Sequence, residues 1–296
     1  MILTIGTFDS LHKGHLKILN EVRKQASRKG AKACVITFEN RPKHILSRRN
    51  DGIILGNEDR LEYFKDLGMD LVLLLRFNTK LARMSPLEFL ERLNRSFQVQ
   101  AIIVGEDFRF GSRNKGTVRT LEQYSERFGY SLRIFRNVRE KSEKISTSAI
   151  KNHILKGEIE QANRELGRYF SLRGRVVKGQ GLGKKIKFPT INLELINKSI
   201  IIPDNGVYLT RIGFKDRSYY GMTYVGMKFI NKRFVIETNI FRFHRNIYGE
   251  RIILSFIKKL RNEKRFVSIK GLTEQLVQDR DQAICSMKNI KRRFFS

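Results

Sequence analysis

Short apolar segments and amphipathic segments alternate along the first 135 residues, and this alternation restricts the fold more than any other feature of the chain. The apolar segments have the length of buried strands, and the segments between them carry apolar residues at helical spacing. Strands that alternate with helices are typical of a parallel sheet with helices on both faces. We predict strands over residues 2–5, 33–38, 71–75, 101–104 and 131–135, and helices over residues 15–28, 58–67, 86–97 and 117–128.

The pattern changes at about Arg173, where short strand-like segments follow one another with turn residues between them. These segments lie at residues 174–177, 206–209, 219–222, 234–237 and 252–256. Regularly spaced short strands favour a small antiparallel barrel or sandwich. Residues 146–166 are predicted to form a helical connection, and residues 272–290 a closing helix. We therefore predict two domains, residues 1–167 and 168–296, in agreement with the chain length.

Composition and charge narrow the class of protein. The longest apolar run, residues 71–75, is far too short to span a bilayer, and we expect no signal peptide. The two cysteines, Cys34 and Cys285, lie far apart in sequence, which favours a reducing, cytoplasmic setting. The formal net charge of +30 predicts attraction to polyanions, but the basic residues are spread along the chain. We therefore favour a solvated basic surface over a dedicated nucleic-acid function. Nucleic acid would bind only through this surface.

The segment with the clearest chemistry joins the first predicted strand to the first predicted helix. Residues 6–15 read Gly-Thr-Phe-Asp-Ser-Leu-His-Lys-Gly-His, which puts His12 and His15 around Gly14. A helix N-terminus offers unpaired N–H groups and partial positive charge, and both suit a phosphate. Two imidazoles at that end can stabilise charge on a phosphorus under attack. We therefore favour phosphate chemistry here over two unrelated histidines.

Further segments occur in an order and spacing that resemble one protein family. They are residues 105–111 (Gly-Glu-Asp-Phe-Arg-Phe-Gly), 145–150 (Ile-Ser-Thr-Ser-Ala-Ile), 188–192 (Phe-Pro-Thr-Ile-Asn), 206–208 (Gly-Val-Tyr), 248–249 (Tyr-Gly) and 260–266 (Leu-Arg-Asn-Glu-Lys-Arg-Phe). The His-x-Gly-His segment resembles the signature of the nucleotidylyltransferase superfamily. With the other segments, nearly the whole chain resembles the bacterial bifunctional riboflavin kinase/FAD synthetases. The resemblance implies an α/β nucleotidylyltransferase (FMN adenylyltransferase) domain with a Rossmann-like parallel sheet, followed by a six-stranded antiparallel riboflavin kinase barrel with a C-terminal helix.

The resemblance also implies the residues of an adenylyltransferase site. His12 and His15 would be catalytic residues that contact the ATP phosphates, with Gly14 letting the helix start approach. The other residues implied to bind nucleotide or flavin are Gly6, Phe8, Asp9, Asp107, Phe108, Arg109, Asn114, Ser146, Thr147 and Ser148. For Asp9 and the hydroxyls of residues 146–148, helix capping stays an alternative. The family usually has glycine at Ser10 and arginine at Lys151, and a lysine lacks the bidentate fork of arginine.

A second site is implied in the predicted barrel. Residues 178–185 contain glycines but do not fit a P-loop, since a lysine stands where a serine or threonine would bind magnesium. The resemblance instead makes this segment a flexible phosphate loop, with Gly183 and Lys184 next to ATP. Thr190 and Asn192 would supply the hard oxygen ligands that suit Mg²⁺.

The implied general base of this second site is Glu237, which falls where the family carries that residue. Arg261 would lie beside the bound nucleotide or flavin. Two departures weaken the match: Lys187 replaces a family glycine, and residues 224–230 match the corresponding family segment only in part.

From these observations we predict an enzyme that uses ATP and Mg²⁺ to phosphorylate riboflavin to FMN, and that then adenylylates FMN to FAD. Three alternatives stay open at this point. They are an FAD synthetase with weakened or lost kinase activity, a nucleotidyltransferase with another acceptor, and a basic nucleic-acid-binding protein on the same scaffold. We expect small-molecule partners and no membrane partner, and the sequence leaves the oligomeric state open.

Overall fold

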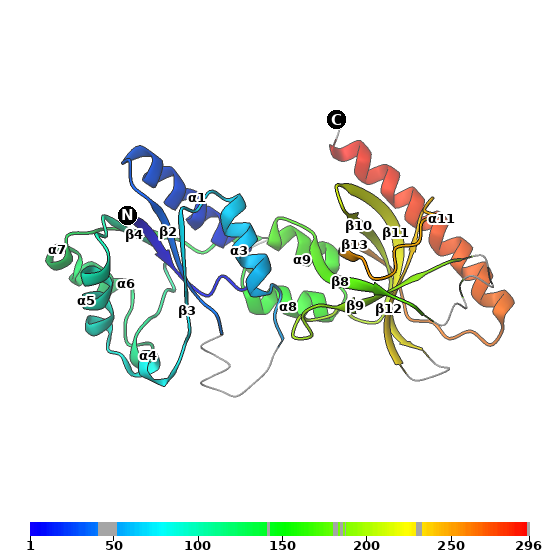
Figure 1. Cartoon of the computed structure of the whole chain (residues 1–296), viewed down its shortest axis with the longest axis horizontal. Helices are drawn as coiled ribbons and strands as arrows, with labels where there is room; N and C mark the ends of the chain where they lie inside the picture. The colour runs from blue at the N-terminus through cyan, green and yellow to red at the C-terminus, as the bar shows by residue number, and fades with distance from the viewer. Residues whose placement is uncertain are drawn as a thin grey trace. The chain divides into compact units, whose positions relative to one another are not determined.

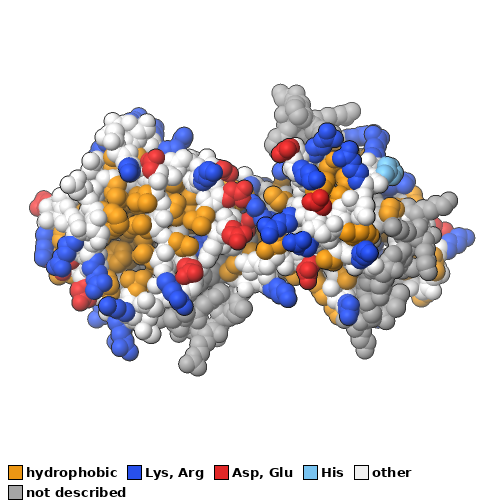
Figure 2. All heavy atoms as spheres, in the orientation of Figure 1, with side chains coloured by type: hydrophobic (Ala, Val, Ile, Leu, Met, Phe, Trp, Pro, Cys, Tyr) orange, Lys and Arg blue, Asp and Glu red, His pale blue; other side chains and the backbone are white. Residues whose placement is uncertain are grey.

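The computed structural model describes residues 1–40, 52–140, 143–179, 183, 186, 188–228 and 233–294. The chain forms two compact units, Met1–Thr147 and Ser148–Ser296 (Figure 1). In the described part of the chain, no helix combines the length and the apolar character that crossing a bilayer requires. Lys and Arg side chains are scattered over both units on the face drawn in Figure 2, between acidic and apolar ones.

The first unit is built on a five-stranded parallel sheet. Its strands are β1 (Ile2–Ile5), β2 (Ala33–Phe38), β3 (Leu71–Leu75), β4 (Ala101–Gly105) and β5 (Ser131–Phe135). They are arranged in the order β3-β2-β1-β4-β5, and every neighbouring pair is parallel. The three central strands are apolar and almost fully buried, as expected for a sheet covered on both faces. The predicted strands and fold class are confirmed.

Helices cover both faces of this sheet. They are α1 (Lys13–Arg28), α3 (Asn57–Asp66), α4 (Thr79–Arg83), α5 (Pro86–Ser96), the 3₁₀-helix η1 (Ser112–Asn114), α6 (Val118–Gln123) and α7 (Ser125–Phe128). Leu19 of α1 and Phe64 of α3 share a core on one face, whereas Leu90 of α5 and Leu121 of α6 share a core on the other. A short hairpin of β6 (Arg139–Glu140) and β7 (Glu143–Lys144) follows β5.

Two predicted helices prove to be broken. The helix expected over residues 117–128 ends at Tyr124, whose φ of −96° and ψ of 1° leave the α region before α7 begins. The connection expected over residues 146–166 consists of α8 (Thr147–Leu155) and α9 (Ile159–Leu166). These two are separated at Gly157, where φ is +75° and glycine is favoured.

The second unit begins with α8 and α9 and continues as a closed barrel. Asn163 of α9 donates hydrogen bonds to the carbonyl oxygens of Phe256 and Ile257, at 2.9 and 3.3 Å. These contacts fix α9 to the barrel, although we predicted the domain boundary after Gly167. Where the two domains can be separated stays a prediction.

Six antiparallel strands close the barrel. They are β8 (Phe170–Val177), β9 (Ile191–Leu195), β10 (Gly206–Phe214), β11 (Arg217–Lys228), β12 (Arg233–Ile240) and β13 (Arg251–Asn262), in the order β10-β11-β12-β9-β8-β13. The pattern of short strands predicts five of them and misses β9. The long helix α11 (Ile269–Phe294) packs on the barrel through Leu276 and the fully buried Ala283. The six-stranded barrel and the closing helix are confirmed.

Candidate active sites

The turn between β1 and α1 contains two residues in unusual backbone conformations. Phe8 and Leu11 have φ values of +49° and +45°, in the left-handed region that non-glycine residues seldom occupy. Both side chains are buried in the core of the first unit, at 2% and 0% exposure. Core packing therefore stabilises a turn whose backbone would not form on its own.

This turn brings the two histidines together at the start of α1. His12 is the N-cap, and its Nδ1 accepts a hydrogen bond from the backbone N–H of His15 at 3.2 Å. The two rings stack, with centroids 3.7 Å apart and planes 8° from parallel. A Cβ at Gly14 would lie 3.0 Å from the His12 ring, so glycine leaves room for the stack. The helix begins at Lys13, two residues before the predicted start, because His12 caps it.

A second segment lies against this turn. The Ser10 hydroxyl, which is fully buried, forms a 2.9 Å hydrogen bond with the Thr147 hydroxyl at the start of α8. Lys13 forms a 3.3 Å ion pair with Glu140 in the hairpin that precedes Thr147. The structure therefore brings the histidine turn and the predicted hydroxyl-bearing turn of residues 146–148 together. Ser10, where the family usually has glycine, supplies part of that connection.

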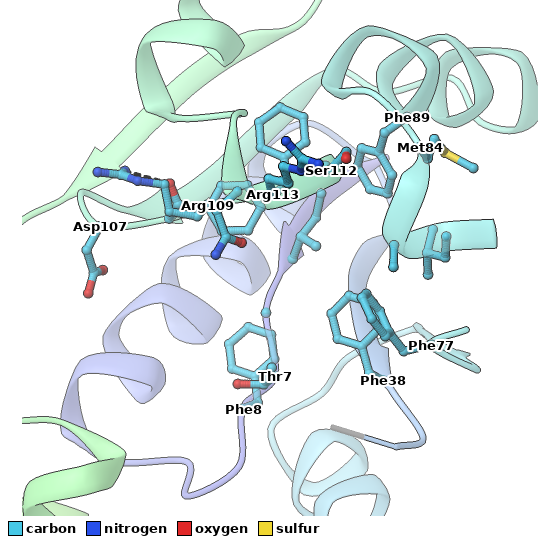
Figure 3. Close-up of a pocket in the computed structure, with 18 of the residues that line it drawn as sticks. Thr7, Phe8, Phe38, Phe77, Met84, Phe89, Asp107, Arg109, Ser112 and Arg113 are labelled. Atoms are coloured by element: carbon cyan, nitrogen blue, oxygen red, sulfur yellow. Dashed lines mark hydrogen bonds between the residues drawn. The ribbon is translucent and has the colours of Figure 1, made fainter. Parts of the chain in front are cut away.

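Beside the turn lies a cavity of about 710 Å³ with aromatic walls (Figure 3). The rings of Phe38 and Phe77 meet edge to face at 5.8 Å, and those of Phe108 and Phe110 stack at 5.5 Å. Figure 3 shows Phe38, Phe77 and Phe89 directed into the same space. A mostly apolar cavity of this size can enclose a planar aromatic ligand and leave its charged end toward the turn.

Most residues implied for the first site are gathered here. Gly6, Phe8, His15, Asp107, Phe108, Arg109 and Asn114 all line the cavity. Two of the charged ones have protein partners: Asp107 forms a 2.7 Å ion pair with Lys144, and Arg109 donates to the carbonyl oxygen of Phe108 at 3.0 Å. Asp9 lies 4.0 Å from the guanidinium of Arg60. The sequence did not predict Phe38, Phe77 or Arg60, because each lies far along the chain from the motif it joins.

In the barrel, cross-strand register assembles the second set of predicted residues. Glu237 on β12 pairs directly with Asn192 on β9, so both side chains emerge on one face of the barrel wall. Thr190 precedes β9 and lies two residues before Asn192. A Cβ at Gly183 would lie 3.2 Å from the Thr190 hydroxyl, so Gly183 of the predicted glycine loop lies beside Thr190. Lys184 and Lys187 lie outside the described residues.

Next to Glu237 lies Tyr224, its cross-strand partner on β11. The Tyr224 hydroxyl donates a hydrogen bond to the Glu263 carboxylate, whose other oxygen accepts from Asn205 at 3.1 Å. Burial raises the pKa of Tyr224, and the hydrogen bond to Glu263 raises it further. Tyr224 therefore stays a neutral donor between two carboxylates. Of the partly matching segment 224–230, residues 229 and 230 are outside the described part of the chain.

Arg261 is engaged with the C-terminal helix. Its Nε and Nη2 donate to the Asp279 carboxylate over 2.8–3.0 Å, and Asp279 is only 1% exposed. Its Nη1 donates to the carbonyl oxygen of Asn262 at 3.0 Å. This residue fixes α11 to β13 as positioned, so its contact with nucleotide or flavin stays a prediction.

A second cavity, of about 300 Å³, opens beside Thr190. Thr238 of β12 and the loop after it line the cavity, including His244, Arg245 and Tyr248. His244 and Arg245 were not among the predicted site residues, since a basic pair in a loop of a strongly basic chain carries no specific signal. Among the described residues, no three His, Cys, Asp or Glu side chains gather as a metal-binding cluster.

Comparison with known proteins assigns both units. A family model described as FAD synthetase matches residues 1–149, and one described as riboflavin kinase matches residues 166–287. The bifunctional riboflavin kinase/FMN adenylyltransferase of Bacillus subtilis is 32% identical over 98% of this chain and 94% of its own length. The chain belongs to the bifunctional riboflavin kinase/FMN adenylyltransferase family.

Two further similar proteins match this chain over nearly its whole length. The Escherichia coli K12 enzyme is 29% identical over 94% of this chain and 90% of its own. A crystal structure from Streptococcus pneumoniae superposes with a TM-score of 0.88 at 30% identity, and covers 95% of this chain and 92% of that one. That protein is described as a macrolide-efflux protein, an activity to which neither matching family model refers. The predicted resemblance is confirmed. Because both units match, the comparisons support the bifunctional enzyme over an FAD synthetase that has lost its kinase half and over a nucleic-acid-binding protein without activity.

Proposed function

We propose that this chain catalyses two successive transfers from ATP. In the first, the γ-phosphoryl group passes to the 5′-hydroxyl of riboflavin, which gives FMN and ADP. In the second, AMP passes to FMN, which gives FAD and pyrophosphate. The observation that carries this proposal is the stacked His12–His15 pair at the start of α1 beside an aromatic cavity, in a chain that also contains a closed barrel matching the riboflavin kinase family.

For adenylyl transfer, the aromatic cavity has the size and the walls to hold the flavin ring. The ATP phosphates would lie at the N-terminus of α1, where backbone N–H groups and the helix dipole favour anions. A phosphate oxygen of FMN attacks the α-phosphorus as its bond to the bridging oxygen breaks, and pyrophosphate leaves. His12 and His15 would stabilise the charge that grows on the α-phosphate oxygens.

The remaining residues of this site have supporting parts. Gly6 and Gly14 would let the phosphates approach the backbone, while Asn114 and Arg109 would contact the nucleotide or flavin from the cavity rim. The hydroxyls of residues 146–148 would form a second phosphate-binding turn. The Ser10–Thr147 hydrogen bond supports this assignment because it holds that turn beside the histidines.

For phosphoryl transfer, Glu237 would take the proton from the riboflavin 5′-hydroxyl as its oxygen attacks the γ-phosphorus and ADP leaves. Arg245 and the cavity beside Thr190 offer a cationic entrance for ATP. Thr190 and Asn192 fit a Mg²⁺ ion, since both carry neutral hard oxygens, Asn192 directly opposite Glu237 and Thr190 beside Gly183. When bound together with ATP, Mg²⁺ would offset the phosphate charge.

The test is a time course of the full-length protein with riboflavin, ATP and Mg²⁺, with FMN and FAD separated by chromatography. We expect FMN to appear first and FAD to follow, and both to be lost when EDTA removes the metal. No FAD from supplied FMN would contradict the proposal. FAD from supplied FMN, without FMN from riboflavin, would contradict its kinase half. A cytoplasmic setting and small-molecule partners remain predictions.

A further inference from the structure

Arg60 is a buried cation in helix α3, whose other basic residue, Lys65, is exposed. Helix α3 buries only Arg60 and Phe64, and the Arg60 residue is 4% exposed. From the sequence, a basic residue on an amphipathic helix is expected to be solvated. A guanidinium taken out of water needs polar partners, because an unpaired buried cation is costly.

The hydrogen-bond partners of Arg60 described below lie around the carboxyl edge of the parallel sheet, and the Asp9 carboxylate is 4.0 Å from its Nη1. Its Nη1 donates to the carbonyl oxygen of Thr7 at 2.5 Å and to the Thr37 hydroxyl at 3.1 Å. Its Nη2 donates to the carbonyl oxygen of Phe38 at 2.5 Å and to Asn57 Oδ1 at 2.5 Å. One planar group therefore joins the residues that follow β1, the end of β2 and the start of α3.

These contacts begin where the sheet's own hydrogen bonds stop. The β1–β2 ladder ends with the bond from Gly6 N–H to the Ile36 carbonyl oxygen, at 3.0 Å. One residue further on, the carbonyl oxygen of Thr7 accepts from Arg60 and also from the Thr37 hydroxyl, at 3.1 Å. Arg60 and Thr37 thus hold Thr7 in place beyond the end of the β1–β2 ladder.

Helix α3 makes a second contact with the same turn, through an aromatic side chain. The ring of Phe64, one helical turn after Arg60, meets the Phe8 ring edge to face at 5.7 Å. Phe8 in turn meets the His15 ring at 5.1 Å. A displacement of Thr7 would therefore also move Phe8, whose backbone has a φ of +49°. Because the Phe8 ring contacts the His15 ring, the stacked imidazoles would move as well.

We propose that Arg60 is a positioning residue for adenylyl transfer, which fixes the Thr7 and Phe38 carbonyls and through them the His12–His15 pair. This inference rests on the function proposed for that site. Lysine at this position would keep the charge but, lacking the planar fork, could not serve acceptors on two strands and a helix at once.

The experiment compares Arg60→Met and Arg60→Lys in the full chain, with both reactions measured on each protein. Because a misplacement of about 1 Å can cost on the order of a hundredfold in rate, Arg60→Met should lower kcat for FAD formation by about thirtyfold to a hundredfold. The KM for FMN should change much less, and FMN formation from riboflavin should stay near the wild-type rate. Arg60→Lys should recover part of the lost kcat.

Lys65→Met is the matched control, since it removes an exposed cation from the same helix and should change neither rate. A second readout is independent of turnover. In protein labelled at histidine, the ring signals of His12 and His15 should shift in Arg60→Met and return toward wild type in Arg60→Lys. Where Arg60→Met does not fold, Asn57→Ala, which removes only one of the acceptors, should shift the same signals and lower kcat less.

An unchanged kcat or unchanged imidazole signals in Arg60→Met would overturn the inference, as would an equal loss of both reactions in a folded variant. Absence of FAD formation by the wild-type chain would instead overturn the proposed function, and the role of Arg60 with it.

Discussion

The two candidate sites are assembled in opposite ways. In the first unit, the histidine pair belongs to one short turn, and a strand on one side and a helix on the other fix its place. In the barrel, Thr190 and Asn192 belong to one segment and Glu237 to another far along the chain, and cross-strand register places Asn192 and Glu237 on one face. The first arrangement is local in sequence, whereas the second exists only after the barrel has closed.

This difference decides what each site tolerates. A local turn depends on a few backbone supports, such as Gly14 and the packing of Phe8 and Leu11. A site built by register depends on the integrity of the whole barrel and on the elements that hold it. We therefore expect changes at the two sites to separate the two reactions, and changes at barrel supports to act on stability.

The largest separation is expected from His12→Ala combined with His15→Ala. Loss of one group that stabilises transition-state charge costs on the order of a hundredfold to a thousandfold, so FAD formation should fall below detection. FMN formation from riboflavin should remain, as measured by chromatography of both products. Lys17→Ala, an exposed residue on the same helix, is the control. Equal loss of both reactions would contradict the claim that the two reactions take place at separate sites.

The converse experiment is Glu237→Gln. Removing a general base lowers the rate by on the order of a hundredfold to ten-thousandfold, so FMN formation should collapse while FAD formation from supplied FMN continues. Glu160→Gln makes the same chemical change at an exposed position on α9 and should leave both rates unchanged. If Glu237→Gln retains kinase activity, Glu237 is not the general base of the barrel site.

A stability effect is expected from Arg261→Met. Breaking the bidentate pair with the buried Asp279 should lower the free energy of unfolding by about 3 kcal/mol, as measured by urea denaturation. Adding Asp279→Asn should recover part of that loss, because the buried carboxylate is no longer left uncompensated. Arg217→Met, at the exposed first residue of β11, should change stability little. A full loss of kinase activity at unchanged stability would instead make Arg261 a ligand contact.

Two glycines allow a matched comparison of the sites. In Gly183→Ala the new Cβ would lie 2.3 Å from the Phe188 carbonyl oxygen, and in Gly14→Ala 3.0 Å from the His12 ring. A backbone atom yields less than a side chain, so the kinase rate should fall about tenfold in the first variant and the FAD rate a few-fold in the second. Gly213→Ala, with its nearest atom at 3.6 Å, is the control. A larger effect at Gly14 than at Gly183 would contradict this ranking.

The smallest effect concerns neither site. A hydrogen bond with His153 lowers the pKa of Glu158, so the folded protein binds that proton less tightly than the unfolded chain. The resulting stability is present above the ordinary glutamate pKa and is lost as the pH falls through the lowered one. Because Glu158 is exposed, Glu158→Gln should cost less than about 1 kcal/mol at neutral pH. Thermal melts should show that the stability difference between wild type and Glu158→Gln vanishes in acid. A stability difference that grows in acid would contradict the lowered pKa of Glu158.

Sequence reasoning succeeded where the signal is local. The alternation of strands and helices predicts the parallel sheet, and the strand–turn–helix segment predicts where His12 and His15 lie. It missed β9 (Ile191–Leu195), which follows the Phe-Pro-Thr segment and of which only Asn192 is interpreted, as a ligand. Glu237 on a strand resembles any solvent-facing glutamate, so only resemblance to a family identified it. Register between distant strands leaves no trace in local composition.

Arg60 marks the same limit in the first unit. A basic residue on an amphipathic helix has the pattern of a solvated side chain, and its four acceptors come from three separate elements. The aromatic cavity is similar, since Phe38, Phe77 and Phe89 follow or lie in different elements and carry no common spacing. Contacts of this kind depend on tertiary packing rather than on periodicity.

The central claim is that the imidazole pair at the start of α1 receives the triphosphate of ATP next to the flavin. The most direct measurement is a crystal structure of the full chain with FMN and a non-hydrolysable ATP analogue. We predict phosphates in contact with His12 and His15 at the N-terminus of α1, with the flavin ring in the aromatic cavity. A nucleotide bound elsewhere in the first unit, with both histidines untouched, would contradict it.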